Sequence, residues 1–512
     1  MTKKLFILVI LVLVAVPAFA QSVDTAWVRR YNGPAYGGDV ANAIAVDGSG
    51  NVYVTGRSEG SGTDYDYATI KYYPDGDTAW VRRYNGPGDS SDYASDIAAD
   101  GSGNIYVTGL SEGSGTSYDY ATIKYYANGD TAWLRRYNGT GNLDDGALAI
   151  AADGSGNVYV TGTSFGSGTD YDYATIKYYA NGDTAWLRRY NGTGNLDDGA
   201  LAIAVDGSGN VYVTGTSYGS GIDYDYATIK YYPDGDTAWV RRYTGYAGAV
   251  AYAIAVDGSG NVYVTGLSSV WSGIDHDYAT IKYYPDGDTA WTRRYNGPGT
   301  LDDGALARAV EGSGNGYVTG KSYGSRTGIN YDYATIKYYA NGGTAWVRRY
   351  NGPGNSHDEA YAIAVDGSGN VYVTGESYGS GIGDDFATIK YYPNGDTAWV
   401  RRYNGPGNYY DRANAIAVDD SGNVYVTGES CGSGEDYDYA TIKYVQYLCG
   451  DVSGDGVVDV GDVVYLINYL YKNGSPPYPL VAGDVNADGI VDVGDVVYLI
   501  NYLFKNGPPP SC

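Results

Sequence analysis

The chain has 512 residues, and its 33 Lys and Arg against 59 Asp and Glu give a formal net charge of −26. Nucleic acids and anionic membranes bind basic surfaces, so this charge argues against both as partners and suits an exported protein that holds Ca²⁺. The 77 glycines and 61 tyrosines favour short strands and tight turns, with Tyr supplying the aromatic packing.

The first twenty residues have the pattern of a secretory signal. Two lysines near the start precede an apolar run that ends in the small-residue sequence Ala18-Phe19-Ala20. A single membrane anchor is the alternative, but the run is short for a membrane span. We expect residues 1–20 to be removed and the mature protein to be secreted and extracellular, without a later span.

A unit of about 53 residues then recurs eight times within residues 21–446. Three phrases, "AIAVDGSGN", "NVYVTG" and "DYATIKYY", keep step with a "TAW" phrase, and their side chains alternate as in strands. The turn sequences "DGSGN" and "PDGD" separate them. Four short strands per unit are typical of a propeller blade. The repeated Trp residues, which we expect to pack between blades, are Trp27, Trp80, Trp133, Trp186, Trp239, Trp291, Trp346 and Trp399.

The two ends of this array complete each other. Residues 25–31 form an outer strand without a blade, and residues 415–444 supply three strands without a fourth. Lending the first strand to the last blade would remove the open edges of the array. The sequence therefore predicts an all-β, eight-bladed β-propeller closed by the N-terminal strand.

The repeated phrases resemble the SBBP family of bacterial β-propeller repeats over roughly residues 24–444. The family name implies seven blades, whereas the copies count eight, so a seven-bladed ring with a loose extra unit is the alternative. Two connections in each copy are nearly constant and the other two vary. In a four-stranded blade the two variable connections lie on the same face, which is expected of a binding surface and equally of unconstrained drift.

No catalytic constellation stands out. The two histidines, His276 and His357, lie in different copies, and neither a Ser/His/Asp group nor a phosphate-binding loop accompanies them. A pair of carboxylates across the ring is the remaining enzymatic alternative. We expect a protein that is not an enzyme. In the sixth copy Arg308 replaces an inner-strand Ile, and we expect Glu311 or a neighbouring acid to pair with it.

Residues 447–512 contain two copies, 33 residues apart, of a Ca²⁺ loop followed by a helix. Such loops place oxygen ligands at positions 1, 3, 5, 7 (backbone), 9 and 12, with Gly at position 6. We expect one Ca²⁺ ion in each loop. The expected ligands are Asp451, Ser453, Asp455, Val457, Asp459 and Asp462 in the first loop, and Asp484, Asn486, Asp488, Ile490, Asp492 and Asp495 in the second.

Asp at position 12, the missing helix before each loop and the tandem copy resemble a type I dockerin domain over residues 450–507. The resemblance implies a small α-helical, Ca²⁺-binding domain that docks a cohesin module on another extracellular protein. Many dockerins carry Ser or Thr and basic residues at the docking positions, where this chain has Val-Gly and Ile-Asn. The implied partner-binding residues are Val460, Gly461, Ile467, Asn468, Val493, Gly494, Ile500 and Asn501.

Cys449 and Cys512 bracket this module, and an exported protein can keep a disulfide between them. The whole chain thus reads as a secreted, non-catalytic binding or scaffold protein whose tail attaches it to a cohesin-type partner or the cell surface. One alternative is a carbohydrate-binding or polysaccharide-degrading component of an extracellular complex, for which Trp271, Tyr409 and Tyr410 would supply sugar stacking. The other is a structural surface-layer protein, which predicts self-association.

Overall fold

The computed structural model describes residues 22–512 except 36, 61, 63, 167–169, 220–222, 271–274, 300, 325–329, 380–381 and 435. The predicted signal and Trp271 lie outside the described residues. The chain divides into two compact units, Thr25–Val445 and Gln446–Cys512, the second grouped with the N-terminal end through Asp24. No helix in the described part of the chain is long and apolar enough to span a bilayer.

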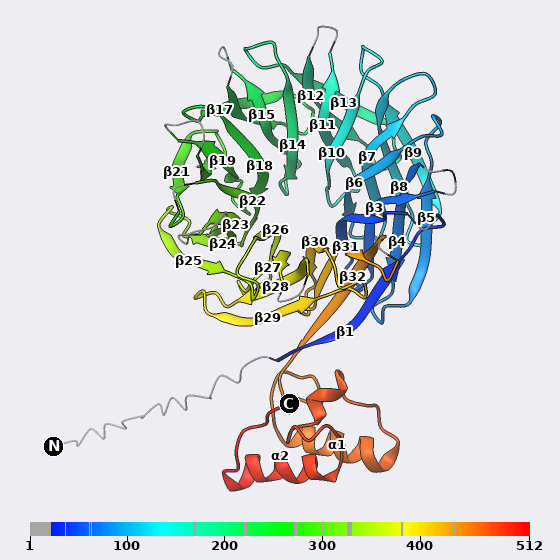
Figure 1. The fold of residues 1–512 in the computed structure, drawn as a ribbon, viewed down its shortest axis with the longest axis vertical. Coiled ribbons are helices and arrows are strands. Elements are labelled where there is room, and N and C mark those ends of the chain that lie inside the picture. Colours follow the sequence, from blue (N-terminus) through cyan, green and yellow to red (C-terminus); the bar gives the residue numbers. More distant parts are fainter. Residues whose placement is uncertain are drawn as a thin grey trace, which may run out of the picture. The chain divides into compact units, whose positions relative to one another are not determined.

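The first unit is a ring of eight four-stranded antiparallel sheets (Figure 1). Blades 1 to 4 consist of β2 (Val40–Val46), β3 (Val52–Glu59), β4 (Tyr65–Tyr72) and β5 (Thr78–Tyr84); β6 (Asp92–Ala99), β7 (Ile105–Glu112), β8 (Tyr118–Tyr125) and β9 (Thr131–Tyr137); β10 (Asp145–Ala152), β11 (Val158–Phe165), β12 (Tyr171–Tyr178) and β13 (Thr184–Tyr190); and β14 (Asp198–Val205), β15 (Val211–Tyr218), β16 (Tyr224–Tyr231) and β17 (Thr237–Thr244). Blades 5 to 8 consist of β18 (Ala249–Val256), β19 (Val262–Ser269), β20 (His276–Tyr283) and β21 (Thr289–Tyr295); β22 (Asp303–Val310), β23 (Gly316–Tyr323), β24 (Tyr331–Tyr338) and β25 (Thr344–Tyr350); β26 (Asp358–Val365), β27 (Val371–Tyr378), β28 (Asp384–Tyr391) and β29 (Thr397–Tyr403); and β30 (Asp411–Val418), β31 (Val424–Cys431) and β32 (Tyr437–Tyr447) with β1 (Ser22–Tyr31).

The alternation of side chains explains why the middle strands are buried on both faces. Val52 and Val54 of β3 pack in one cluster with Tyr425 of blade 8. Tyr53, which points the other way, belongs to the cluster shared with Ile105 of blade 2. Each blade thus offers aliphatic side chains to one neighbour and Tyr to the other, so the hydrophobic core runs around the ring between the blades.

The repeated Trp joins neighbouring blades, as the sequence predicted. The indole Nε1 of Trp27 donates a hydrogen bond of 3.1 Å to the carbonyl oxygen of Pro74 in blade 1. Its ring lies 5.9 Å from that of Tyr72 and 6.3 Å from that of Tyr425. Trp80 makes the same bond, of 3.2 Å, to Ala127 in blade 2. Burial of so large a ring at each joint contributes at least about 1.5–3 kcal/mol.

The N-terminal strand closes the ring, which confirms that prediction. β1 pairs with β32 at the outer edge of blade 8, in the order β1-β32-β31-β30. Tyr31 of β1 packs edge-on against Tyr439 of β32, with 5.5 Å between ring centroids. The ring has eight blades, and the seven-bladed alternative is wrong because every copy forms its own sheet.

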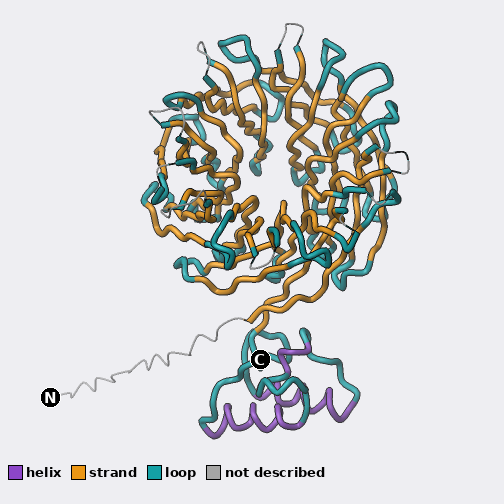
Figure 2. Tube along the Cα trace, in the orientation of Figure 1, coloured by secondary structure: helices purple, strands orange, loops and turns teal. Residues whose placement is uncertain are grey.

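The second unit contains two helices, α1 (Val460–Lys472) and α2 (Val493–Lys505), and a short 3₁₀ turn, η1 (Leu480–Gly483) (Figure 2). One stripe of each helix faces the other across a small apolar core, in which Leu466 and Leu499 are fully buried. The loops that precede the helices carry the predicted Ca²⁺ ligands.

Candidate functional site

The two loop–helix units of the C-terminal module have matching helix starts. Asp459 is the N-cap of α1, where its Oδ1 accepts a hydrogen bond from the backbone N of Gly461. Asp462 reaches back to the backbone N of Asp459, which completes a capping box. Asp492 and Asp495 make the same box at the start of α2. Loop positions 9 and 12 therefore fix where each helix begins.

The acid at position 1 organises each loop around itself. Asp451 Oδ1 accepts the backbone N–H groups of Gly454 and Asp455, at 2.9 and 3.0 Å, and Oδ2 accepts that of Gly456 at 2.8 Å. Gly456 has a φ of +87°, a backbone conformation that glycine adopts without strain. In the second loop, Asp484 accepts the N–H groups at positions 5 and 6 in the same way.

The acid at position 12 is buried beside the acid at position 1. Asp462 is fully buried and accepts N–H bonds from Ser453 and Asp459, at 2.8 and 2.9 Å. Burial raises the pKa of its carboxyl, the backbone bonds lower it, and the charge of Asp451 raises it further. Asp495 is likewise buried, and burial and the charge of Asp484 raise its pKa. Each loop thus holds two neighbouring like charges that a cation would compensate.

The residues present fit Ca²⁺, which prefers carboxylate and carbonyl oxygen in flexible geometry. Every side-chain ligand predicted in the two loops offers oxygen, and each loop has glycine at position 6. Within the described residues no three His, Cys, Asp or Glu side chains converge closely enough to hold a metal. In the first loop, the carboxylates at positions 1, 5, 9 and 12 each accept a backbone N–H bond from their own loop.

The predicted partner-binding residues divide into two classes. Val460 and Val493, at loop position 10, are 55% and 52% exposed. Ile467 and Ile500 instead pack partly against the core of the module. The remaining four predicted residues are half-buried, except for the exposed Gly461.

The sequence reasoning missed an exposed apolar stripe on each helix. Val464 and Tyr471 continue the exposed row that Val460 begins on α1, because Val464 follows Val460 by four residues and Tyr471 follows Val464 by seven. Val497 and Phe504 do so after Val493 on α2. The sequence does contain a sign of this stripe, because apolar residues recur at these positions in both helices, 33 residues apart, outside the stripe that packs in the core.

A disulfide joins the two ends of the module. Cys449 and Cys512 are bonded, with 5.8 Å between their Cα atoms and 63 residues between them in sequence. Cys449 also belongs to the apolar core of the module. The bond therefore ties the segment before the first loop to the segment after the second helix.

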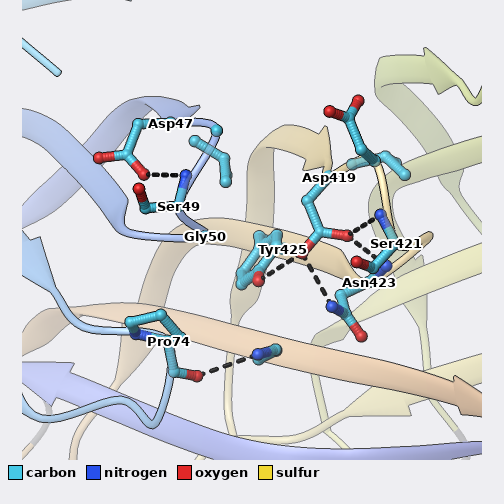
Figure 3. A pocket seen from close by; sticks show the side chains of 13 residues that line it. Asp47, Ser49, Gly50, Pro74, Asp419, Ser421, Asn423 and Tyr425 are labelled. Carbon is cyan, nitrogen blue, oxygen red and sulfur yellow. Dashed lines mark hydrogen bonds between the residues drawn. The ribbon is translucent and has the colours of Figure 1, made fainter. Parts of the chain in front are cut away.

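In the propeller, a hollow of about 360 Å³ lies between the "DDSGN" turn of blade 8 and the "DGSGN" turn of blade 1 (Figure 3). Asp419 Oδ2 accepts bonds from Asn423 Nδ2 and Tyr425 OH, while Oδ1 accepts backbone N–H groups of the turn. Asp153 lines an equivalent hollow between blades 3 and 4 and makes the same bonds within its turn. These acids stabilise hairpin turns, which accounts for their repetition.

Blade 6 corrects the expectation that Glu311 pairs with Arg308. The Arg308 guanidinium does not pair with Glu311, which instead accepts hydrogen bonds from its own turn, at Ser313 and Asn315, and from Tyr317. Arg308 Nη1 donates to the carbonyl oxygen of Tyr263, and its guanidinium carbon lies 4.8 Å from the Tyr263 ring centroid. Burial lowers the pKa of Arg308 to about 9, and the charge of Asp257, a neighbouring acid, acts in the opposite direction.

The two histidines occupy separate places. His276 Nδ1 lies 2.8 Å from Oδ1 of Asp302, and His357 stacks 5.6 Å from the ring of Tyr331. His276 begins β20 and His357 directly precedes β26, so the two rings lie in different blades.

Two family models match the chain. A beta-propeller repeat of the SBBP family matches residues 26–62, 79–115, 185–223, 238–270, 345–383 and 398–434. A dockerin type I domain matches residues 449–504. The third and sixth copies lie outside the six repeat matches, yet each forms the same four-stranded sheet.

No curated protein matches the chain. Among solved structures, Sqt1 from Chaetomium thermophilum is 10% identical with a TM-score of 0.45, over 83% of this chain and 99% of its own. A puromycin hydrolase is 12% identical with a TM-score of 0.44, over 76% and 58%. An ancestral GH74 enzyme is 12% identical with a TM-score of 0.35, over 75% and 60%. Likenesses this distant carry no argument about function.

The family matches and the sheet topology agree on the organisation of the chain. It consists of β-propeller repeats of the SBBP family followed by a dockerin type I domain.

Proposed function

We propose that this is a secreted, non-catalytic binding protein whose C-terminal module attaches it to a cohesin-type module on another extracellular protein or at the cell surface. One Ca²⁺ ion in each of the two loops holds the docking surface, and the propeller is the binding module that the tail positions. In this proposal the predicted loop ligands hold the two Ca²⁺ ions, and the predicted docking residues contact the cohesin-type partner.

The observation that carries the proposal is the equivalence of the two loop–helix units. Asp451 and Asp484 organise their loops through the same contacts, and Asp462 and Asp495 cap their helices in the same way. Each helix presents the same exposed row, Val460, Val464 and Tyr471 on α1 and Val493, Val497 and Phe504 on α2. An apolar row on a small charged module is typical of a protein-binding surface.

Calorimetric titration of the full mature chain with cohesin modules, in Ca²⁺ and in chelator, tests the proposal. We expect binding in Ca²⁺ only, and its loss when Val460, Val464, Val493 and Val497 are all changed to Ser. The matched control changes four exposed propeller tyrosines, Tyr73, Tyr126, Tyr179 and Tyr232, to Ser. Loss of binding in the control, or binding that persists in chelator, would contradict the assignment of the docking surface to the tail.

A carbohydrate ligand for the propeller is the second candidate. Tyr409 and Tyr410 are 46% and 43% exposed in a variable connection and lie edge-on to each other, 4.5 Å between centroids. Aromatic faces of this kind stack on the apolar face of a sugar ring. Binding of the mature chain to a glycan array, lost in a Tyr409→Ala, Tyr410→Ala double variant, would support this candidate, whereas an array without any bound glycan would reject it.

A further inference from the structure

Six of the eight third strands begin with Tyr at the end of the blade that carries the variable connections. In two blades a basic side chain of the same chain covers that ring. The Arg57 guanidinium carbon lies 5.2 Å from the ring centroid of Tyr65 in blade 1. The Lys321 Nζ atom lies 4.9 Å from that of Tyr331 in blade 6, and 3.1 Å from Oε1 of Glu359.

Blades 3 and 4 have the same backbone arrangement without the basic side chain. Thr163 and Thr216 occupy the strand register that Lys321 occupies in blade 6, and each faces a glycine on the inner strand, as Lys321 faces Gly304. A hollow of about 510 Å³ lies over blades 2 to 4, at the place where a side chain equivalent to that of Lys321 would extend from Thr163 or Thr216. Its walls are the rings of Tyr118, Tyr171 and Tyr224 with Leu110 and Leu201.

The hollow is acidic. Asp144, Asp197 and Asp198 line it, and the described residues of its lining include neither Lys nor Arg. Asp197 Oδ1 accepts the backbone N of Tyr171 at 3.0 Å, which holds this carboxylate beside the Tyr ring. The equivalent acid in blade 6, Asp302, is 2.8 Å from the His276 ring nitrogen, so the chain itself places a proton-binding group against this carboxylate.

We propose that this hollow binds a basic side chain, lysine or arginine, of a partner polypeptide, in the place that Lys321 fills in blade 6. The inference rests on the proposed binding role of the propeller and names the chemistry of its ligand. The aromatic rings attract the cation, Asp197 and Asp144 neutralise it, and Leu110 and Leu201 cover the aliphatic stem. We expect a polypeptide ligand because the basic side chains that cover the equivalent Tyr rings in this chain, Arg57 and Lys321, belong to β-strands.

The direct test titrates the full mature chain with a capped peptide that contains two lysines. The matched probes are the same peptide with Nε-acetyl-lysines, free butylamine and a panel of neutral oligosaccharides. We expect the lysine peptide to bind at least about tenfold more tightly than the acetylated peptide, because acetylation removes the charge. Equal binding of both peptides would overturn the cationic assignment, and butylamine as tight as the peptide would overturn the polypeptide source. An oligosaccharide that binds in the hollow while the lysine peptide does not would make it a glycan site.

Two variants use the repeat itself as a control. Thr163→Lys with Thr216→Lys should fill the hollow from within, as Lys321 does, and weaken peptide binding at least about tenfold, while Thr163→Val with Thr216→Val should retain it. Lys321→Thr should open an equivalent hollow in blade 6 and add one peptide site. Unchanged binding in the double Lys variant would overturn the location. Binding of the tail to cohesin modules serves as the separate readout, since it depends on none of these residues.

Discussion

The Nη2 atom of Arg30 lies 2.7 Å from Oδ2 of Asp438, which stands 408 residues later in the chain. In blade 1 the equivalent pair, Arg83 and Asp66, lies 2.8 Å apart within a single blade, 17 residues apart in sequence. The two arginines have nearly the same partners, since Arg30 also donates to Ser430 and Arg83 to Ser58. Only the first pair bridges the seam at which the ring closes.

Arg30→Ala and Arg83→Ala should therefore differ in kind. Each removes one partner of a partly buried ion pair, so each should lower the free energy of unfolding by about 2 kcal/mol. Only Arg30→Ala should loosen β1 from β32. Hydrogen exchange at the amides of β1 should therefore become faster in Arg30→Ala, whereas exchange at the amides of β5 should stay unchanged in Arg83→Ala. Equal exchange in both strands would show that the seam does not depend on Arg30.

Arg308 and Gly316 should be coupled. A Cβ atom on Gly316 would lie 3.5 Å from the Tyr263 ring and 3.8 Å from Arg308 Nη2, which are ordinary contacts, so the further methyl groups of the Val found in most other copies would meet the packed Tyr263 and Arg308 side chains. Gly316→Val alone should destabilise blade 6 by about 1–3 kcal/mol through overpacking, whereas Arg308→Ile with Gly316→Val restores the repeat sequence and removes a buried cation. Chemical denaturation of the single and double variants gives the coupling energy. Additive effects would mean that the two substitutions are independent.

Asp96 should make stability depend on pH. Burial raises the pKa of its carboxyl from 3.8 to about 6, against the effect of its bonds to the backbone N–H groups of Ile150 and Ile97. The native state then binds this proton more tightly than the unfolded state, so the free energy of unfolding falls as pH rises between these values. Asp96→Ala introduces the residue that blade 3 has at the equivalent position, Ala149, and should remove this contribution to the pH dependence. Ser95→Ala is the control and should keep it. If Asp96→Ala and the native chain had the same pH profile of unfolding between pH 4 and 6, the raised pKa of Asp96 would be contradicted.

Much of the fold was predictable because the repeat displays its own register. Trp27 and its seven equivalents set the period, and the lone strand before the first blade predicted the closure. The pairing of Arg308 was not predictable, because the guanidinium found a backbone carbonyl and the Tyr263 ring, which no local pattern marks. The hollow over blades 2 to 4 was also missed, since it depends on Thr216 lying where Lys321 lies in another blade.

In the C-terminal module, the loop positions could be predicted from the residue spacing, but the exposed faces of the helices could not. Loop positions 1, 6 and 12 can be counted along the sequence, and the structure places Asp451, Gly456 and Asp462 around one loop. Which helix residues are exposed is a property of packing between α1 and α2. The predicted Ile467 therefore lies partly in the core, while the unpredicted Tyr471 is 64% exposed.

The two loops should bind Ca²⁺ independently. Asp451→Ala removes the acid that organises the first loop, and Asp484→Ala does the same in the second, so each should reduce the stoichiometry measured by calorimetry from two ions to one. Asp75→Ala, in an exposed propeller turn, is the control and should keep both ions. A chain that binds Ca²⁺ equally after both loop substitutions would place the ions elsewhere.

The disulfide should stabilise the C-terminal module alone. Closing a loop of 63 residues stabilises the module by about 4 kcal/mol if the effect arises from chain entropy. Cys512→Ser should therefore lower the melting temperature of this module and leave that of the propeller unchanged, in separate calorimetric transitions. Cys431→Ser, in a buried site of blade 8, is the matched control. A shift in the propeller transition with Cys512→Ser would contradict a purely local role.

The most direct test of the account asks which unit holds the partner. The mature chain and an Asp451→Ala, Asp484→Ala double variant would be immobilised and titrated with cohesin modules, in Ca²⁺ and after chelation. The account predicts that the native chain binds in Ca²⁺, releases its partner in chelator, and loses binding in the double variant while the propeller stays folded by circular dichroism. A partner held equally by both chains and in chelator would show that attachment does not depend on the C-terminal module.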